Sequence, residues 1–540
     1  MRRFAAPVLL TMLFMAGDAA VGEAFYWQRA IHLERAGTYK TGIFDESASE
    51  IPAYDRHTKR LFVVNSAQDS LDVFDLHDPA NIQRIKQVPT GGNPNSVAVH
   101  RGLVAVAVEA AVKTDPGSVK FYDTDGTLLK TLTVGALPDM VTFTPDGDHV
   151  LVANEGEPND DYTVDPEGSV SVIDLSRGLN RAIVRTADFH AFNAKKAKLQ
   201  AAGVRIFGPD LSTADPKDTV SVSQDFEPEY IAVSDDSRRA WVSLQENNAF
   251  AVIDIRRAKV IDVLPLGYKD HSKTRNALDA SDKDDGINIK PWPVYGMYQP
   301  DTIATYRVRG RTYIVSANEG DSRDYDGYSE EARVKDLDLD PVAFPDAATL
   351  QKNANLGRLN VTTANGDADG DGKFEKLFAF GARSFAIWTD SGHLVFDSGD
   401  DFEQITAAQI PADFNSDNSE NGSFDGRSDN KGPEPEGVAI GEIGGRTYAF
   451  VGFERIGGII VYDITNPYRP RYVEYVNNRD FGGDPEADTA GDLGPEGLLF
   501  IAAKDSPTRK PLLVVANEVS GSTSIYRIES IKDHDHQAWR

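Results

Sequence analysis

Short apolar runs alternate with turn residues along almost the whole chain. Typical runs are RLFVVNS, GLVAVAVEA, HVLVANEG and PLLVVANE, and each follows a shorter run such as NSVAVH or DMVTFTPDG. Many are followed by a third run that ends in Asp, as in SLDVFDL and GSVSVIDL. Runs of four to eight residues rich in β-branched side chains and bounded by Gly, Asp and Ser are typical of β-strands. The pattern predicts an all-β chain with tight turns.

These strands recur as a unit of three or four, and the unit occurs seven times. The first two units begin about 45 residues apart, the usual length of one four-stranded propeller blade. The seventh unit (496–528) has three strands, and the N-terminal stretch WQRAIHLERAG supplies the missing outer strand. Closing the ring in this way removes exposed sheet edges. We predict a single seven-bladed β-propeller over residues 25–530.

Three segments interrupt the repeat. Residues 186–226 contain FNAKKAKLQAAG, which predicts a short helix. Residues 321–380 form a polar, acid-rich insertion between the second and third strands of the fifth unit. Residues 413–433 contain few apolar side chains and predict a flexible or ion-ordered acidic loop. Residues 531–540 form a polar tail. Long loops on one propeller face commonly build a binding site.

The N-terminus has the pattern of an export signal. MRR supplies positive charge, FAAPVLLTMLFMAG the apolar region and VGEA a small-residue cleavage site, which predicts a signal peptide over residues 1–24. The alternative is a membrane anchor, but the run is short for a spanning helix. We expect export to the periplasm or medium, with no transmembrane segment. The chain has no cysteine, so core burial, alone or with bound metal, must stabilise it in place of disulfides.

The charge balance narrows the set of partners. The chain has 84 acidic and 56 basic residues among 540, a net charge of −28. This excess makes nucleic acid and anionic membranes poor partners and favours metal ions or cationic surfaces. We expect a monomer that binds divalent metal ions.

Acidic residues recur at two fixed positions of the unit. The innermost strand of nearly every unit opens with Pro and then a polar residue, and the second strand ends at a second polar position. The first set comprises Glu50, Asn95, Asp139, Glu229, Asp301, Glu436 and Glu496. The second set comprises Ser66, Glu109, Glu155, Glu246, Glu319, Glu454 and Glu518. Because the start of a first strand and the end of a second lie at one edge of a blade, we expect two rings of carboxylates at one mouth of the channel.

Crowded carboxylates repel one another and must protonate or share a cation. Hard divalent ions prefer oxygen ligands, and Ca²⁺ accepts six to eight of them in loose geometry. We therefore predict a metal site at the mouth, for Ca²⁺ first and other divalent ions second. The alternative is that individual acids cap turns at blade ends. The predicted ligands are Glu155, Glu229, Asp301, Glu319, Glu436, Glu496 and Glu518.

A second calcium pattern lies in the large insertion, in GDADGDGKFEKL. Asp367, Asp369, Asp371 and Glu375 occupy positions 1, 3, 5 and 9 of an EF-hand-type loop. Position 12 is Phe378, so a complete EF-hand is not expected. We predict a calcium-stapled loop, against the alternative of a solvated acidic turn.

Motifs of nucleophilic catalysis are missing from the sequence, which contains no cysteine, GxSxG or HExxH. Phosphate chemistry needs cationic groups near the substrate. Arg323 in GDSRDY and Arg383 in GARSF are the candidate phosphate contacts. The alternative for each is an ion pair that holds neighbouring acids in place.

Several motifs resemble those of the choice-of-anchor I domain family. They include ANEGEPNDDYTVDPEGSVSVIDL, FEPEYIAVSDD, YIVSANEGDSRDY and GPEGLLFI, and the resemblance spans residues 28–530. The resemblance implies a secreted or surface-anchored β-propeller. The family includes mesenchyme-specific cell-surface glycoproteins and bacterial members labelled alkaline phosphatase. Two functions stay open: a calcium-dependent phosphoester hydrolase that acts on a phosphorylated small molecule, and a non-enzymatic scaffold that binds calcium, mineral or a partner.

Overall fold

Seven sheets of four antiparallel strands dominate the computed structural model, which describes residues 31–210 and 219–531. The predicted signal peptide and nearly all of the polar tail lie outside these residues. Each of the first four sheets consists of four consecutive strands. The first sheet contains β2 (Pro52–Asp55), β3 (Arg60–Asn65), β4 (Ser70–Asp75) and β5 (Gln83–Pro89), and the second contains β6 (Pro94–His100), β7 (Leu103–Val108), β8 (Pro116–Asp123) and β9 (Leu128–Ala136). The third sheet contains β10 (Pro138–Phe143), β11 (His149–Asn154), β12 (Ser169–Asp174) and β13 (Ile183–Asp188), and the fourth contains β14 (Pro228–Val233), β15 (Arg239–Leu244), β16 (Ala249–Asp254) and β17 (Lys259–Pro265).

The last three four-stranded sheets draw on more distant segments. They consist of β20 (Ile303–Val308), β21 (Arg311–Asn318), β27 (Ser384–Thr389) and β28 (Leu394–Asp397); β29 (Pro435–Ile443), β30 (Arg446–Phe453), β31 (Ile459–Asp463) and β32 (Arg471–Val476); and β33 (Pro495–Ile501), β34 (Leu512–Asn517), β35 (Ser522–Ser530) and β1 (Ile31–Lys40). β1 pairs antiparallel with β35, from Ile31 opposite Ser530 to Lys40 opposite Ser522. The predicted closure of the last sheet by the N-terminal strand is confirmed.

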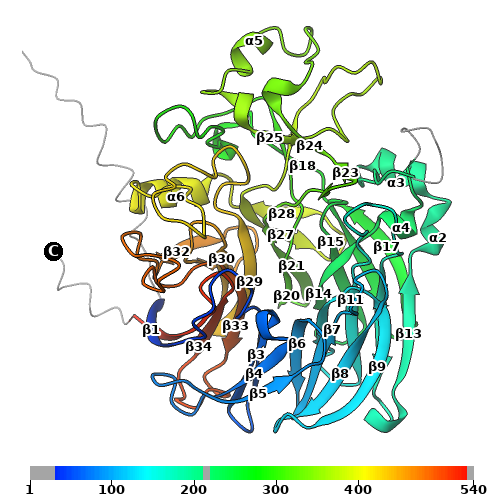
Figure 1. Ribbon diagram of the computed structural model, residues 1–540, viewed down its shortest axis with the longest axis vertical. Helices are drawn as coiled ribbons and strands as arrows, with labels where there is room; N and C mark the ends of the chain where they lie inside the picture. The colour runs from blue at the N-terminus through cyan, green and yellow to red at the C-terminus, as the bar shows by residue number, and fades with distance from the viewer. Residues whose placement is uncertain (1–30, 211–218, 532–540) are drawn as a thin grey trace, which may run out of the picture.

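The sheets form a β-propeller. Their first strands contact one another in chain order, from β2 to β6, β10, β14, β20, β29 and β33, and β33 returns to β2. Figure 1 shows the sheets side by side around this centre. Second strands such as β3 and β11 are buried on both faces, which explains their continuous apolar runs. Outer strands such as β5 are largely exposed and correspondingly polar.

The insertion after β21 has an apolar core of its own, built together with residues 268–297. A five-stranded sheet joins β18 (Tyr268–Asp270), β19 (Tyr295–Met297), β26 (Phe378–Ala379), β25 (Asn360–Thr362) and β24 (Glu331–Arg333), and β22 (Asp324–Tyr325) pairs with β23 (Tyr328–Ser329). Trp292, Leu339, Phe344 and Leu356 are buried in this core. The insertion projects at the top of Figure 1. Sequence analysis did not identify the contribution of residues 268–297.

Short helices complete the fold: α2 (His190–Asn193), α3 (Lys196–Ala202), α4 (Val222–Asp225), α5 (Ala347–Leu350) and α6 (Asp401–Gln409). α3 lies where the sequence predicted a helix. Residues 413–433, predicted to be flexible or ion-ordered, are packed, with Phe414 and Asn415 fully buried. Hydrogen bonds such as that from Asn415 Nδ2 to Ser428 Oγ (2.9 Å) hold the segment together. Of the helices in the described ranges, none has the length and apolarity that a membrane span requires.

Candidate metal centre

Four acids of the first-strand ring, Asp139, Glu229, Glu436 and Glu496, directly follow a proline at which the strand pairing is interrupted. The ladder between the first and second strands is interrupted directly after Pro138, Pro228, Pro435 and Pro495. Proline lacks an N–H donor, so such interruptions are where it is tolerated in a sheet. The residue after each of these prolines departs from the regular alternation of side chains between the two faces of the strand. Its side chain lies in the wall of the central channel.

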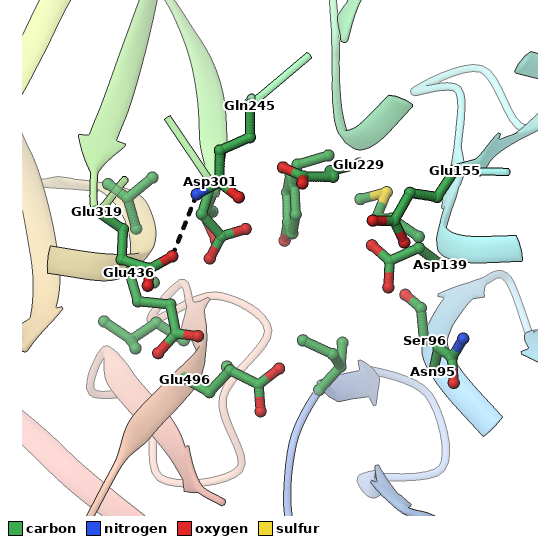
Figure 2. Close-up of a pocket in the computed structure, with 18 residues that line it drawn as sticks. Asn95, Ser96, Asp139, Glu155, Glu229, Gln245, Asp301, Glu319, Glu436 and Glu496 are labelled. Atoms are coloured by element: carbon green, nitrogen blue, oxygen red, sulfur yellow. Dashed lines mark hydrogen bonds between the residues drawn. The ribbon is translucent and has the colours of Figure 1, made fainter. Parts of the chain in front are cut away.

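A cavity of about 230 Å³ lies where these side chains meet. The lining carboxylates belong to five of the seven sheets, and Figure 2 shows them pointing towards the centre of the cavity. Its polar lining consists of Asn95, Ser96, Asp139, Glu155, Glu229, Tyr230, Gln245, Asp301, Thr302, Glu319, Glu436 and Glu496. None of the described residues that line it is Lys or Arg. The cavity holds seven carboxyl groups and no cationic side chain, so it attracts cations.

Burial shifts the protonation of these groups. It raises the pKa of Glu229, Asp301, Glu436 and Glu496 well above the usual carboxyl value, and the neighbouring acids add to the shift. Burial, with smaller contributions from nearby glutamates, raises the pKa of Asp139 to about 7. Burial therefore favours protonated carboxyl groups at neutral pH, and a bound cation would replace those protons.

Several carboxylate oxygens in the cavity lack any partner. Oε2 of Glu229, Glu436 and Glu496 is buried and accepts no hydrogen bond from the described residues. The Glu229 residue is only 8% exposed. A buried, unpaired carboxylate oxygen costs free energy unless a donor or an ion satisfies it. These oxygens have the chemistry of ligands for a hard metal ion.

Three groups of carboxylates bring one oxygen from each member within 4.8 Å of the others at the mouth. They are Asp301–Glu319–Glu436, Glu319–Glu434–Glu454 and Glu436–Glu454–Glu518. The first and third groups share Glu436, whose side chain lies between them. Each group provides three oxygen ligands and leaves positions for water or another ligand.

The middle group is already neutralised by the protein. Lys431 Nζ lies 2.6 Å from Glu319 Oε1, 3.1 Å from Glu434 Oε2 and 2.7 Å from the Gly320 carbonyl oxygen. Arg455 contacts Glu434 at 3.1 Å and Glu454 at 3.0 Å. Although burial opposes it, the charges of Lys431 and two arginines lower the pKa of Glu434 below its usual range. A metal ion therefore fits the first and third groups better than the middle one.

The second predicted ring is only partly at the cavity. Glu155 and Glu319 line it, and Glu454 and Glu518 belong to the ligand groups beside it. Three members have other surroundings. Ser66 donates a hydrogen bond to Glu50 Oε2 (2.5 Å), Glu109 accepts one from Asn93 Nδ2 (3.0 Å), and in the fourth sheet Gln245 rather than Glu246 lines the cavity. Gln245 donates to Glu319 Oε2 (3.2 Å), as Figure 2 shows.

Neither arginine predicted to contact phosphate lines the cavity. Arg323 is 1% exposed, and its guanidinium lies 2.8 Å from Asp225 Oδ1 and 3.0 Å from Glu227 Oε2. Arg383 is 4% exposed; it pairs with Glu403 (2.6 Å) and donates to three carbonyl oxygens. Both side chains serve the alternative role, as buried ion pairs between segments distant in sequence.

The loop of the large insertion brings its four predicted ligands together. One oxygen from each of Asp367, Asp369, Asp371 and Glu375 lies within 4.8 Å of the others. Backbone N–H groups donate to several of them, including Gly370 to Asp367 Oδ1 (2.7 Å) and Ala368 to Glu375 Oε2 (2.7 Å). The loop could hold a metal ion and is largely exposed.

Sequence analysis missed Glu434 and Lys431 at the mouth and Glu227 beside it. A signal for two of them was present, because the tripeptide Glu-Pro-Glu occurs both at 227–229 and at 434–436. The predicted ring contains only the acid that follows each proline, so the acids that precede Pro228 and Pro435 were left out. Nothing in the sequence around Lys431 marks it as the partner of Glu319.

The family model for the choice-of-anchor I domain matches residues 50–467. Gigasin-3a of Magallana gigas is 32% identical over 194 residues, which cover 34% of this chain and 68% of that protein. The mesenchyme-specific cell surface glycoprotein of Strongylocentrotus purpuratus is 28% identical over 321 residues, covering 52% of this chain and 40% of that protein. The chain thus spans less than half of the second relative.

Among solved structures, the β-propeller domain of Myceliophteria thermophila Cps50 (Swd1) aligns with a TM-score of 0.44 at 10% identity, over 93% of this chain and 100% of that chain.

Proposed function

Because the chain belongs to the choice-of-anchor I domain family, we propose that it is an exported, seven-bladed β-propeller whose function is to bind divalent cations, calcium first, at the mouth of its channel. The observation that carries the proposal is the pair of carboxylate groups that share Glu436 beside a cavity whose described lining contains no cationic side chain. Two ions would be held there, with Glu436 between them.

Calcium fits this donor set better than other metals. The ligands are carboxylates with the amide of Gln245 nearby, and histidine and cysteine take no part among the described residues of the three groups. Hard oxygen donors in an irregular arrangement suit Ca²⁺, whereas Mg²⁺ requires a near-octahedral shell and Zn²⁺ prefers nitrogen or sulfur. The name of the sea-urchin relative, a cell surface glycoprotein, supports a location on the extracellular side.

A phosphoester hydrolase is the second candidate. Two metal ions that share a ligand can bind a phosphoryl group and activate water, and the sharing of Glu436 favours this reading. Against it, Lys431 uses its ammonium group on Glu319, Glu434 and the Gly320 carbonyl, so it is not free to bind phosphate. We therefore place cation binding first, as a scaffold function, and hydrolysis second.

Equilibrium dialysis of residues 25–540 against Ca²⁺ or Mg²⁺ tests the proposal. The protein would carry Asp369→Asn and Asp371→Asn so that the insertion loop does not contribute. We expect two Ca²⁺ bound per chain and much weaker Mg²⁺ binding. Absence of calcium binding up to 10 mM would refute the metal function. Hydrolysis of an aryl phosphate that calcium restores after chelation, and that Glu436→Gln abolishes, would instead establish the second candidate.

A further inference from the structure

The face opposite the mouth carries an unusual set of arginines. Each first strand begins at the mouth, so the hairpin that joins it to the second strand lies at the other end of the sheet. Two neighbouring hairpins, β14–β15 and β20–β21, place five exposed arginines there, which we call the arginine patch: Arg238, Arg239, Arg307, Arg309 and Arg311.

Four of the five arginines in the patch have no carboxylate of the described residues within ion-pair distance. Arg239, Arg307, Arg309 and Arg311 form no ion pair with any carboxylate of the described residues, and Arg238 has a single long contact of 3.9 Å. The buried arginines at positions 205, 323 and 383 are each paired with an acid. In a chain with 28 excess negative charges, four arginines on two neighbouring hairpins that form no ion pair with the described residues point to a ligand outside the fold.

A hollow of about 550 Å³ lies against the β20–β21 hairpin and contains no acidic residue. Its lining combines two guanidinium groups, two aromatic rings, hydrogen-bonding groups and small apolar surfaces: Val308, Arg309, Arg311, Tyr313, Thr465, Asn466, Pro467 and Tyr468. Tyr468 is 58% exposed, and its ring meets that of Tyr313 edge-on at 6.4 Å. The volume is in the range of ordinary ligand pockets.

On the other side of the same hairpin lies a smaller hollow of about 280 Å³, lined by Arg238, Arg239 and Arg307 among others. It also contains three aspartates. One of them, Asp236, is held in its turn by hydrogen bonds from Ser234 Oγ (2.8 Å) and the Arg238 N–H (3.2 Å). An extended ligand could cross the hairpin tip and contact arginines in both hollows.

The negative charge of the mouth does not cancel the positive potential of the arginine patch. A six-residue strand spans about 20 Å at ~3.3 Å per residue, and the Debye length is ~8 Å at physiological ionic strength. Salt therefore screens the mouth carboxylates from a ligand bound at the opposite face. The local field is set by the arginines and the three nearby aspartates.

We propose that the arginine patch binds an acidic polysaccharide. The planar guanidinium group recognises carboxylate and sulfate oxygens with paired hydrogen bonds, and an exposed tyrosine offers an apolar face with a polar end on which a sugar ring packs. Thr465 and Asn466 supply donors and acceptors for sugar hydroxyls. A nucleic acid strand needs successive aromatic platforms for its bases, and this hollow has one exposed ring, so the saccharide is the better fit.

Fluorescence anisotropy tests the proposal with labelled hexasaccharides from heparin and alginate, in 150 mM NaCl and EDTA so that calcium cannot bridge. We expect binding of at least one acidic hexasaccharide and none of a neutral dextran. Comparison of the two acidic probes tells sulfate from carboxylate recognition. Arg309→Gln with Arg311→Gln should lower the affinity at least tenfold.

The matched control, Lys198→Gln with Lys352→Gln, makes the same charge change at exposed lysines elsewhere and should change the affinity less than twofold. Tyr468→Ala should lower it about fivefold while leaving its salt dependence unchanged. Failure of both acidic probes to bind, or equal losses in the patch variant and the control, overturns the proposal. Tighter binding of an oligothymidylate that requires the same arginines overturns the polysaccharide assignment.

Discussion

Replacing Glu436 by Gln has opposite expected effects on the metal-free and the calcium-bound protein. Without metal, Glu436 is a buried acid beside other acids, and burial raises its pKa well above the usual value. The neutral amide removes this cost, so Glu436→Gln should unfold at a higher temperature than its parent in EGTA. With calcium, the same change removes the ligand that two carboxylate groups share.

The calcium effect has a predictable size. A site with a Kd of about 10⁻⁴ M, in the range of extracellular calcium modules, contributes ~2.7 kcal/mol at 10 mM calcium. Two sites contribute ~5 kcal/mol. With an unfolding entropy of ~2.1 cal/mol/K per residue, a chain of about 500 residues loses ~1 kcal/mol per kelvin near its midpoint. Calcium should therefore raise the Tm of the parent by about 5 °C.

For Glu436→Gln the rise should nearly vanish. The attraction between one carboxylate charge and a cation is ~4 kcal/mol per unit charge at 4 Å and an effective dielectric of 20. Its loss is enough to lower the affinity for each calcium ion at least ~100-fold. The residual stabilisation is then ~0.8 kcal/mol in total, or less than 1 °C.

The assay is scanning calorimetry at pH 7.5, with EGTA or 10 mM calcium, in the Asp369→Asn, Asp371→Asn background. Glu50→Gln is the matched control, because Glu50 is a buried acid of the same ring that belongs to none of the ligand groups. The control should keep the 5 °C rise. A full rise in Glu436→Gln, or its loss in Glu50→Gln as well, would refute the assignment of Glu436 as the shared ligand.

Four further predictions concern charge. Burial raises the pKa of Asp139 to about 7 and of Glu50 to about 8. The contribution of these two groups to folding stability is complete below the ordinary carboxyl pKa and is lost as pH rises through 7 to 8. In EGTA the Tm should therefore fall between pH 5 and 9, and a constant Tm would contradict this. Over the same pH range calcium affinity should rise with proton release, measured by calorimetry in two buffers of different ionisation heat. Lys431→Met removes the cation that pairs with Glu319 and should strengthen calcium binding at the first group in equilibrium dialysis; an unchanged calcium affinity contradicts the role of Lys431. Arg323→Gln should lower stability by ~3–5 kcal/mol, because it leaves two buried acids unpaired, while calcium binding persists; a Tm within 1 °C of the parent contradicts that role.

The β-propeller and the acid ring were predictable from the sequence because both depend on local rules. Alternation of apolar runs with turn residues defines strands, and the proline before each first-strand acid marks where the ladder breaks. Glu229, Glu436 and Glu496 follow this rule, and all three line the cavity.

What sequence reasoning missed depends on contacts between distant segments. Arg323 pairs with Asp225 across 98 positions, and Lys431 reaches Glu319 across 112. A surface arginine and a buried one look alike in sequence, since burial is decided by what packs over them. The core shared by residues 268–297 and the large insertion was missed because its strands have only two or three residues, too few for a periodicity to appear.

The pairing of β1 with β35 has a consequence for how the protein is made. Residue 31 meets residue 530 in the finished sheet, so β1 waits for β35 to be synthesised, and the ring stays open until then. Contacts between such distant residues form slowly and leave sheet edges exposed to aggregation. The pairing of β1 with β35 therefore sets an order of assembly. The other six sheets can form as the chain emerges, and the last sheet closes only when both β1 and β35 have been synthesised.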